Sequence, residues 1–76
     1  MITPQQLKSL GFEPLKRHAG DFYTTFRLTM SILLIDVTTD LEAGLQTVEI
    51  GIMDSWHRCN NIPTIIELQT LIQSLK

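Results

Sequence analysis

The run Ser31–Thr38, with the sequence Ser-Ile-Leu-Leu-Ile-Asp-Val-Thr, decides the fold of this chain. Large aliphatic side chains follow one another in it until Asp36 interrupts them. Because successive side chains of a strand point to opposite faces, such a run predicts a strand that is buried on both faces. A strand of this kind belongs in the middle of a β-sheet.

Three other stretches predict the strands that accompany this run. Phe22–Leu28 and Leu45–Met53 alternate between apolar and polar residues, which is typical of strands with one buried face. Phe12–His18 is predicted to be an edge strand, because Pro14 lacks the amide that a central strand needs for its hydrogen-bond ladder. Ser55–Ile62 has no such periodicity, and we expect it to be a loop.

The two ends of the chain carry helix signals. In Thr3–Gly11 a threonine can cap the first turn, a proline occupies the first helical position and a glycine follows the last turn. Near the other end, Thr64 and Glu67 have the spacing of a capping box, in which each side chain bonds to the backbone amide of the other residue. Apolar residues then recur at helical spacing from Ile65 to Leu75.

The predicted order is therefore helix, four strands, helix, with short links between the strands. Short links permit only antiparallel neighbours, because a parallel crossover needs a long connection. The sequence predicts an α+β fold of two layers, in which a four-stranded antiparallel meander carries the N- and C-terminal helices on one face. At 76 residues, the chain is expected to be a single domain over residues 1–76.

Composition and charge narrow the classes of function. Hydrophobic residues make up 43% of the chain and charged residues 18%, a balance typical of a folded protein rather than a disordered one. A net charge of −2 argues against the non-specific phosphate binding of basic domains. We expect no secretory signal, because residues 1–15 contain no long apolar run, and no stretch of the sequence is apolar over the length that spans a bilayer; the single Cys59 fits a reducing compartment. We expect a cytoplasmic protein with no membrane partner.

Asp54, His57, Cys59 and the distant His18 are the residues that could ligate a metal or act in catalysis. Zinc sites usually contain paired cysteines, and this chain has one. His57 is expected to point away from Cys59 on an extended segment, so the two are not expected to act as base and nucleophile. The glycines are isolated, which excludes a phosphate-binding loop. The sequence predicts no enzyme activity, no metal site and no cofactor.

Charged residues of the predicted sheet leave two questions open. Asp36 can face solvent on the open side of the sheet, lie at the end of its strand, or pair with Arg27 across strands. Lys16, Arg17 and Arg27, with Tyr23, can form a small basic patch that includes an aromatic ring, a pattern found in sheets that bind single-stranded RNA. This patch supports an alternative prediction, a regulator associated with nucleic acid.

Surplus hydrophobicity is the main clue to function in the sequence. If the helices cover one face of the sheet, the aliphatic residues of the central run leave apolar surface on the other face. Exposed apolar patches usually mark an interaction surface. We therefore predict a non-enzymatic interaction protein whose partner is another protein or a second copy of itself, through a candidate surface of Ile32, Leu34, Trp56, His57 and Arg58. Alternatively, Ser55–Ile62 folds over that face.

The ends of the chain also carry a resemblance. Leu7–Glu13 reads Leu-Lys-Ser-Leu-Gly-Phe-Glu, and Ile62–Ile72 reads Ile-Pro-Thr-Ile-Ile-Glu-Leu-Gln-Thr-Leu-Ile. A short opening helix that closes on Leu-Gly-Phe, a meander and a capped terminal helix resemble small uncharacterised proteins of bacterial phages, prophages and other mobile elements. The resemblance implies this layout and a mobile-element origin, and it implies no activity or site residues. Pro14 and the Trp56–Asn61 segment lie outside the shared pattern.

Overall fold

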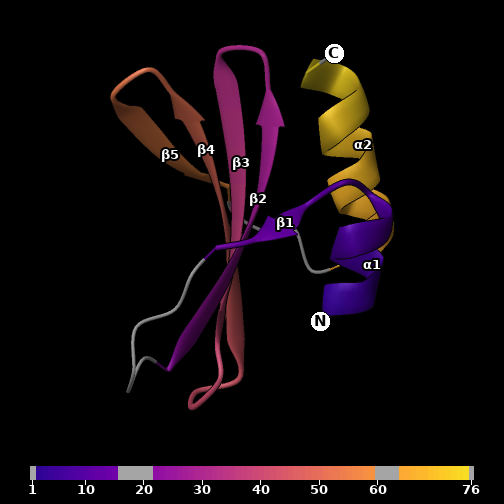
Figure 1. Ribbon diagram of the computed structural model, residues 1–76, viewed down its shortest axis with the longest axis vertical. Coiled ribbons are helices and arrows are strands. Elements are labelled where there is room, and N and C mark those ends of the chain that lie inside the picture. The colour runs from indigo at the N-terminus through magenta and orange to yellow at the C-terminus, as the bar shows by residue number, and fades with distance from the viewer. Residues whose placement is uncertain (1, 16–21, 60–63, 76) are drawn as a thin grey trace.

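The computed structural model describes residues 2–15, 22–59 and 64–75. Its strands form one antiparallel sheet in the order β1-β2-β3-β4-β5. Both helices lie on the same side of this sheet (Figure 1). The predicted α+β meander is confirmed, but the sheet has five strands where four were expected. The elements are α1 (Pro4–Ser9), β1 (Glu13–Pro14), β2 (Tyr23–Met30), β3 (Leu33–Asp40), β4 (Leu45–Ile52), β5 (Ser55–Cys59) and α2 (Ile65–Leu75).

The decisive apolar run forms β3, the middle strand of the sheet, as predicted. The strand begins two residues later than expected, at Leu33, because Ser31 and Ile32 form the turn that joins it to β2. Ser31 has a φ of 54°, which takes it out of the β region. This shift decides which side chains of the run reach which face.

The core lies between the sheet and the helices. In the cross-strand row through its centre, Phe26 pairs with Val37, and Val37 pairs with Val48. The helices contribute buried leucines to the same cluster, Leu7 from α1 and Leu68 from α2. The buried apolar residues of the cluster are Ile2, Leu7, Phe12, Phe26, Ile35, Val37, Val48, Leu68 and Ile72.

Both predicted helix caps are present. The Thr3 hydroxyl accepts from the Gln6 amide at 3.2 Å, and the Gln6 side chain accepts from the Thr3 amide at 2.9 Å, which completes a capping box. At α2, the Thr64 hydroxyl accepts from the Glu67 amide at 3.2 Å. These caps satisfy amides that have no partner within the first helical turn.

The N-terminal segment is held at the end of the sheet by Gln46 of β4. Its Oε1 accepts from the Ile2 amide at 2.9 Å, and its Nε2 donates to the Ile2 carbonyl at 2.9 Å. This amide therefore pairs with the backbone of Ile2 as a neighbouring strand would. A mainly apolar hollow of 270 Å³ opens beside it, slightly smaller than the usual range for ligand pockets. Its lining residues are Ile2, Thr3, Pro4, Leu7, Thr24, Phe26, Thr39 and Leu41.

The prediction of a loop over Ser55–Ile62 is wrong for its first part. Ser55–Cys59 forms β5, which pairs with β4 from Ile52 opposite Ser55 to Val48 opposite Cys59. A two-residue turn, Met53 and Asp54, reverses the chain between the two strands. Most side chains of β5 are exposed on both faces, so no apolar alternation marks the strand in the sequence. Residues 60–62 of the predicted loop lie outside the described residues.

The predicted edge strand Phe12–His18 is confirmed in its position and is shorter than expected. β1 consists of Glu13 and Pro14, opposite Arg27 and Phe26 of β2. Phe12 precedes the strand and is buried in the core. Residues 16–18 of the predicted strand lie outside the described residues.

Candidate interaction surface

The face of the sheet turned away from the helices, which we call the open face, is mainly polar. Of the apolar run in β3, Leu34 points there and is half-buried, while Ile35 and Val37 point into the core. The expected broad aliphatic patch is therefore absent from the described strands, because Asp36 and Thr38 occupy the next open-face positions of β3. The side chains of this face in β2–β5 are Tyr23, Thr25, Arg27, Thr29, Leu34, Asp36, Thr38, Asp40, Leu45, Thr47, Glu49, Trp56 and Arg58.

A row of charged residues crosses the open face from one edge of the sheet to the other. It runs through Glu13, Arg27, Asp36, Glu49 and Arg58, one residue from each strand. Such cross-strand neighbours lie close enough to interact directly. Its members include two neighbouring acids, Asp36 and Glu49, and the ion pair recorded in the row joins Arg27 to Asp36.

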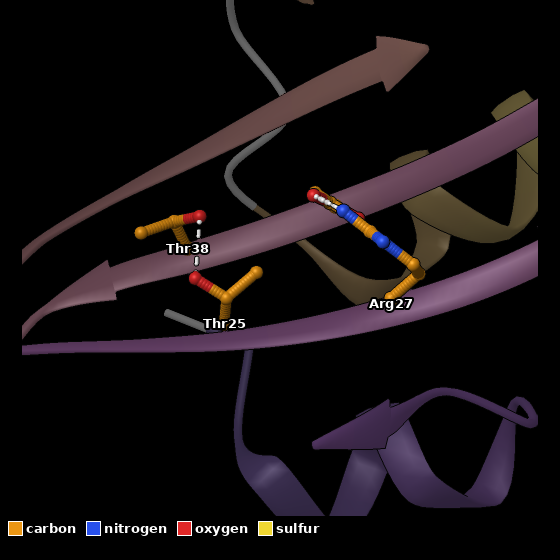
Figure 2. A network of polar contacts seen from close by, with 4 residues as sticks. Thr25, Arg27 and Thr38 are labelled. Carbon is orange, nitrogen blue, oxygen red and sulfur yellow. Dashed lines mark hydrogen bonds and ion pairs between the residues drawn. The ribbon is translucent and has the colours of Figure 1, made fainter. Parts of the chain in front are cut away.

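Arg27 and Asp36 form a bidentate ion pair at the centre of this row. The Arg27 Nε donates to Oδ1 of Asp36 at 2.8 Å, and Nη2 donates to Oδ2 at 2.9 Å. The hydrogen bonds to Asp36 raise the pKa of the Arg27 guanidinium above its ordinary value, against the opposing effect of burial. Of the three places open to Asp36, the cross-strand pair with Arg27 is confirmed. Figure 2 shows Arg27 reaching toward the neighbouring strand, beside the 3.1 Å hydrogen bond between the hydroxyls of Thr25 and Thr38.

Trp56 of β5 lies flat against the open face. Its cross-strand partner is Gly51, and a Cβ added to that glycine would lie 2.8 Å from the indole ring. The ring therefore occupies the space that a side chain at residue 51 would need. The guanidinium carbon of Arg27 lies 5.6 Å from the centre of the ring, within the range of a cation–π contact. Ser55–Cys59 therefore extends the sheet as an edge strand instead of folding over this face, and the Trp56 ring, which remains 43% exposed, is the part of it that lies over the neighbouring strand.

A shallow hollow of 300 Å³ lies on the open face beside β5. Its charged residues are Asp40, Glu49 and Arg58, and its exposed apolar side chains are Tyr23 and Leu45. Thr38 and Thr47 form the remainder of its lining. The two acids beside Arg58 give this hollow a mixed charge rather than a basic one.

The structure brings together only part of the predicted interaction surface. Leu34, Trp56 and Arg58 share the open face. Ile32 lies instead in the β2–β3 turn, where it is 74% exposed. His57 points to the opposite side of β5 from its two neighbours, because adjacent residues of a strand alternate.

Of the predicted basic patch, Arg27 and Tyr23 share the open face on β2, where Arg27 is already paired with Asp36. Tyr23 lines the hollow described above and is 55% exposed. Lys16 and Arg17 lie outside the described residues. The described part of the patch therefore offers a ring and a neutralised cation.

His57 and Cys59 lie on the same side of β5, so the expectation that they point apart is wrong. In a strand, residues two apart share a face, and the expected divergence would have required a loop. Cys59 is half-buried against the core, and this burial raises the pKa of its thiol. A raised pKa keeps the thiol protonated and weakens it as a nucleophile. No group of three or more His, Cys, Asp or Glu residues in the described ranges could hold a metal ion.

The direction of the backbone groups in β5 follows from two printed hydrogen bonds of β2. The Leu15 amide donates to the Thr25 carbonyl at 2.8 Å, and the Leu41 amide donates to the Phe22 carbonyl at 2.8 Å. Odd-numbered residues of β2 therefore bond toward β1 and even-numbered ones toward β3. In an antiparallel sheet this alternation continues from strand to strand.

With the register of β3, β4 and β5, the alternation directs the backbone groups of His57 toward β4. The two-residue turn gives the same answer, because the residues that flank such a turn form a hydrogen-bonded pair. The N–H and C=O groups of Trp56 and Arg58 are consequently directed away from β4. β5 is the last strand in the sheet order, so these groups lie on an edge that no described strand pairs with, which we call its free edge.

The sequence analysis missed this edge, although the chain does contain a signal for it. The Met53–Asp54 pair separates two β-prone stretches by two residues, which is the spacing of a tight hairpin. Met53 has a φ of 55°, a conformation that usually calls for glycine, asparagine or aspartate. Because this position is a methionine, the turn lacks its usual composition. The hairpin therefore escaped a prediction based on turn residues.

Among the described residues, no helix is both long enough and apolar enough to cross a membrane. The resemblance to proteins of phages and mobile elements stays a prediction. No protein-family model, curated protein or solved structure matches this chain.

Proposed function

We propose that this chain is a non-enzymatic interaction domain of the cytoplasm that acts through protein–protein contacts. The contact surface consists of the free edge of β5 and the adjoining open-face side chains Trp56 and Arg58. We call this the β5 edge surface. It keeps Trp56 and Arg58 from the predicted surface. In place of the predicted aliphatic patch, it uses the outer edge of β5.

The single observation that carries the proposal is the outer edge of β5, which pairs with no other strand among residues 2–15, 22–59 and 64–75. Unpaired amides and carbonyls along a strand are a template for another extended chain, and this is a common mode of peptide and protein recognition. Proteins usually protect such edges with proline, inward-pointing charges or very short strands. β5 has five residues, none of them proline. Its outward-directed groups are therefore available for pairing.

The side chains on this edge suit a protein partner. Trp and Arg are enriched among residues that dominate binding energy at protein interfaces. The Trp56 ring is already fixed against Gly51 and Arg27, so little side-chain freedom remains to be lost on binding. This preorganisation supports the role of Trp56 as an anchor.

Electrostatics favour a protein over nucleic acid as the partner. Arg27 is engaged by Asp36, and Arg58 lies in a hollow that also contains Asp40 and Glu49. Phosphate backbones need a surface of positive potential, and alternating charges do not provide one. A gel shift with mixed oligonucleotides at low salt tests this alternative. We expect no shift, and a shift abolished by Arg58→Ala would favour the nucleic-acid role.

Affinity capture from the source cells, followed by reconstitution, tests the proposed function. We expect a protein captured by the wild-type chain to be lost with Arg58→Pro, which removes an outward-directed amide, and kept with Gln69→Ala on the exposed face of α2. The captured protein, once purified, should bind Arg58→Pro at least about 10-fold more weakly than wild type. Equal binding to the wild type and to Arg58→Pro would contradict the proposal.

A further inference from the structure

We propose that the partner of the β5 edge surface is a second copy of this chain, paired antiparallel through β5 about a two-fold axis at His57. This inference rests on the proposed function and names its partner. It joins the two sheets into one continuous sheet. The reasons lie in the backbone alternation and in the order of side chains along Ser55–Cys59.

Backbone alternation restricts the possible registers. Only Trp56 and Arg58 of β5 direct their N–H and C=O groups to the free edge, as derived above from the β2 hydrogen bonds. In an antiparallel pair, directly opposed residues that both point outward exchange their hydrogen bonds. A symmetric pair of β5 strands can therefore oppose Trp56 with Trp56, Trp56 with Arg58, or Arg58 with Arg58. Each choice places the two-fold axis at a different residue.

Side-chain chemistry selects the register in which Trp56 faces Arg58 of the other copy. This register uses both outward residues of each chain. The N–H and C=O groups of Trp56 in one copy bond to those of Arg58 in the other, so all of these outward groups are paired. It also places Arg58 of each copy opposite Trp56 of the other on the open face, so that the two arginines do not face each other. Pairing Arg58 with Arg58 would place like charges directly opposite each other, which is unfavourable. Pairing Trp56 with Trp56 would leave both arginines without a cross-strand partner.

Symmetry places His57 opposite itself in this register. The two His57 residues form a non-hydrogen-bonded pair, in which the Cα atoms lie about 4.5 Å apart. Their side chains lie on the side of the sheet opposite to Trp56, where His57 is exposed. In the view of Figure 1, β5 lies on the opposite side of the picture from both helices, which leaves room for a second strand at its edge. Cys59 lies near the end of the pairing, opposite Ser55 of the second copy.

Single-cysteine variants of the full chain test the register. Each carries Cys59→Ser and one of Trp56→Cys, His57→Cys or Arg58→Cys, and each is oxidised in air at micromolar concentration. A Cα separation of about 4.5 Å lies within the range that a disulfide spans. We expect a covalent dimer with His57→Cys, detected by intact mass and by gel electrophoresis without reductant. A greater yield of dimer with Trp56→Cys or Arg58→Cys would overturn the register.

Analytical ultracentrifugation of the unmodified chain tests whether the pair forms at all. We expect a reversible dimer with a dissociation constant between about 10 μM and about 1 mM, because a contact of this length buries an area at the small end of specific interfaces. Arg58→Pro should raise the dissociation constant at least about 10-fold by removing an outward amide from each copy. Arg58→Ala keeps the amide and should weaken the dimer less. Circular dichroism should show that both variants fold, with melting temperatures within a few degrees of each other.

The outcomes separate this inference from the proposed function. A monomer at every concentration, together with no dimer of His57→Cys, overturns the second copy as partner. If a captured foreign protein still loses its binding with Arg58→Pro, the proposed function stands without this inference. If a dimer forms but Arg58→Pro leaves it intact, the β5 edge is not the contact and both fail.

Discussion

The two edges of the sheet are built in opposite ways. β1 ends one side with two residues, Glu13 and Pro14, whereas β5 ends the other with five, Ser55–Cys59. The alternation that directs Leu15 toward β2 turns Pro14 outward, so the position that would offer an amide to another strand has none. Trp56 and Arg58 offer theirs. One edge is thus protected against pairing, and the other is suited to it.

This difference shows that composition alone does not reveal which edge of a sheet is available. Pro14 is tolerated because its missing amide would face away from β2, as the prediction of an edge strand required. β5 has four exposed residues out of five, so no alternation of burial marks it, and it still carries a tryptophan fixed against the neighbouring strand. The available edge therefore lies on a strand that the pattern of apolar residues does not reveal.

The largest expected effect comes from moving a proline to an inward position of β5. His57→Pro removes an amide directed at β4 and should lower the free energy of unfolding by about 3 kcal/mol, since it breaks the ladder and leaves a carbonyl unpaired. Arg58→Pro, one residue later, should cost about 1 kcal/mol or less, because its amide is directed outward. Urea denaturation followed by circular dichroism measures both. Equal losses would mean that the alternation in β5 is assigned wrongly.

A side chain at residue 51 should separate Trp56 from the open face. Gly51→Val places atoms where the indole ring now lies, with the Cβ itself 2.8 Å from the ring. We expect a loss of about 1–3 kcal/mol in stability and a red shift of tryptophan fluorescence, because the ring moves into solvent. Trp56→Ala in the same background is the control. If Gly51→Val lowers stability by the same amount in the Trp56→Ala background, the contact between residue 51 and the ring is not the cause of the loss.

Relief of backbone strain should strengthen the β5 side of the sheet by a smaller amount. Met53 has a φ of 55° in the β4–β5 turn, a conformation that glycine adopts freely. Met53→Gly should raise the free energy of unfolding by about 0.5–1 kcal/mol, and hydrogen exchange of β5 amides should slow. Ser31→Gly, at the equivalent place in the β2–β3 turn, provides the comparison. In Ser31→Gly, hydrogen exchange should slow for amides of β2 and β3 and stay unchanged for amides of β5.

The smallest change in stability is expected at the protected edge. Pro14→Ala restores an outward-directed amide on β1 and should change the free energy of unfolding by less than about 0.5 kcal/mol. If proline protects this edge, the variant should self-associate more than the wild type in ultracentrifugation. Association that stays at the wild-type level would show that the short length of β1 is sufficient protection.

Several features of this fold could be predicted because their causes are local. The caps at Thr3 and Thr64 depend on residues within one helical turn, and both hydroxyls accept the predicted amide, although at Thr64 the Glu67 carboxylate bonds to the Thr64 hydroxyl and no bond to the Thr64 amide completes the box. The place of β3 in the middle of the sheet followed from the consecutive aliphatic residues that precede Asp36. The pairing of Arg27 with Asp36 was one of three open possibilities, and the register decided among them.

The candidate site was predicted only in part, because it depends on register and on an edge. A turn at Ser31 and Ile32 displaced β3 by two residues, which removed Ile32 from the open face. β5 lacks a buried face along most of its length, so no periodicity distinguishes it from a loop. The contact of Trp56 with Gly51 joins two strands, and no local rule links a glycine to a ring on the next strand.

The sequence by itself determined the class of this protein: a small α+β domain with a central apolar strand, capped terminal helices and a proline at one edge. Those features follow from propensity, capping and periodicity, which act over a few residues. Only the tertiary structure decided which face is polar, which edge is unpaired and where Trp56 lies. The physical reason is that a strand's neighbours, and the direction of its amides, are set by pairing with residues distant in the chain.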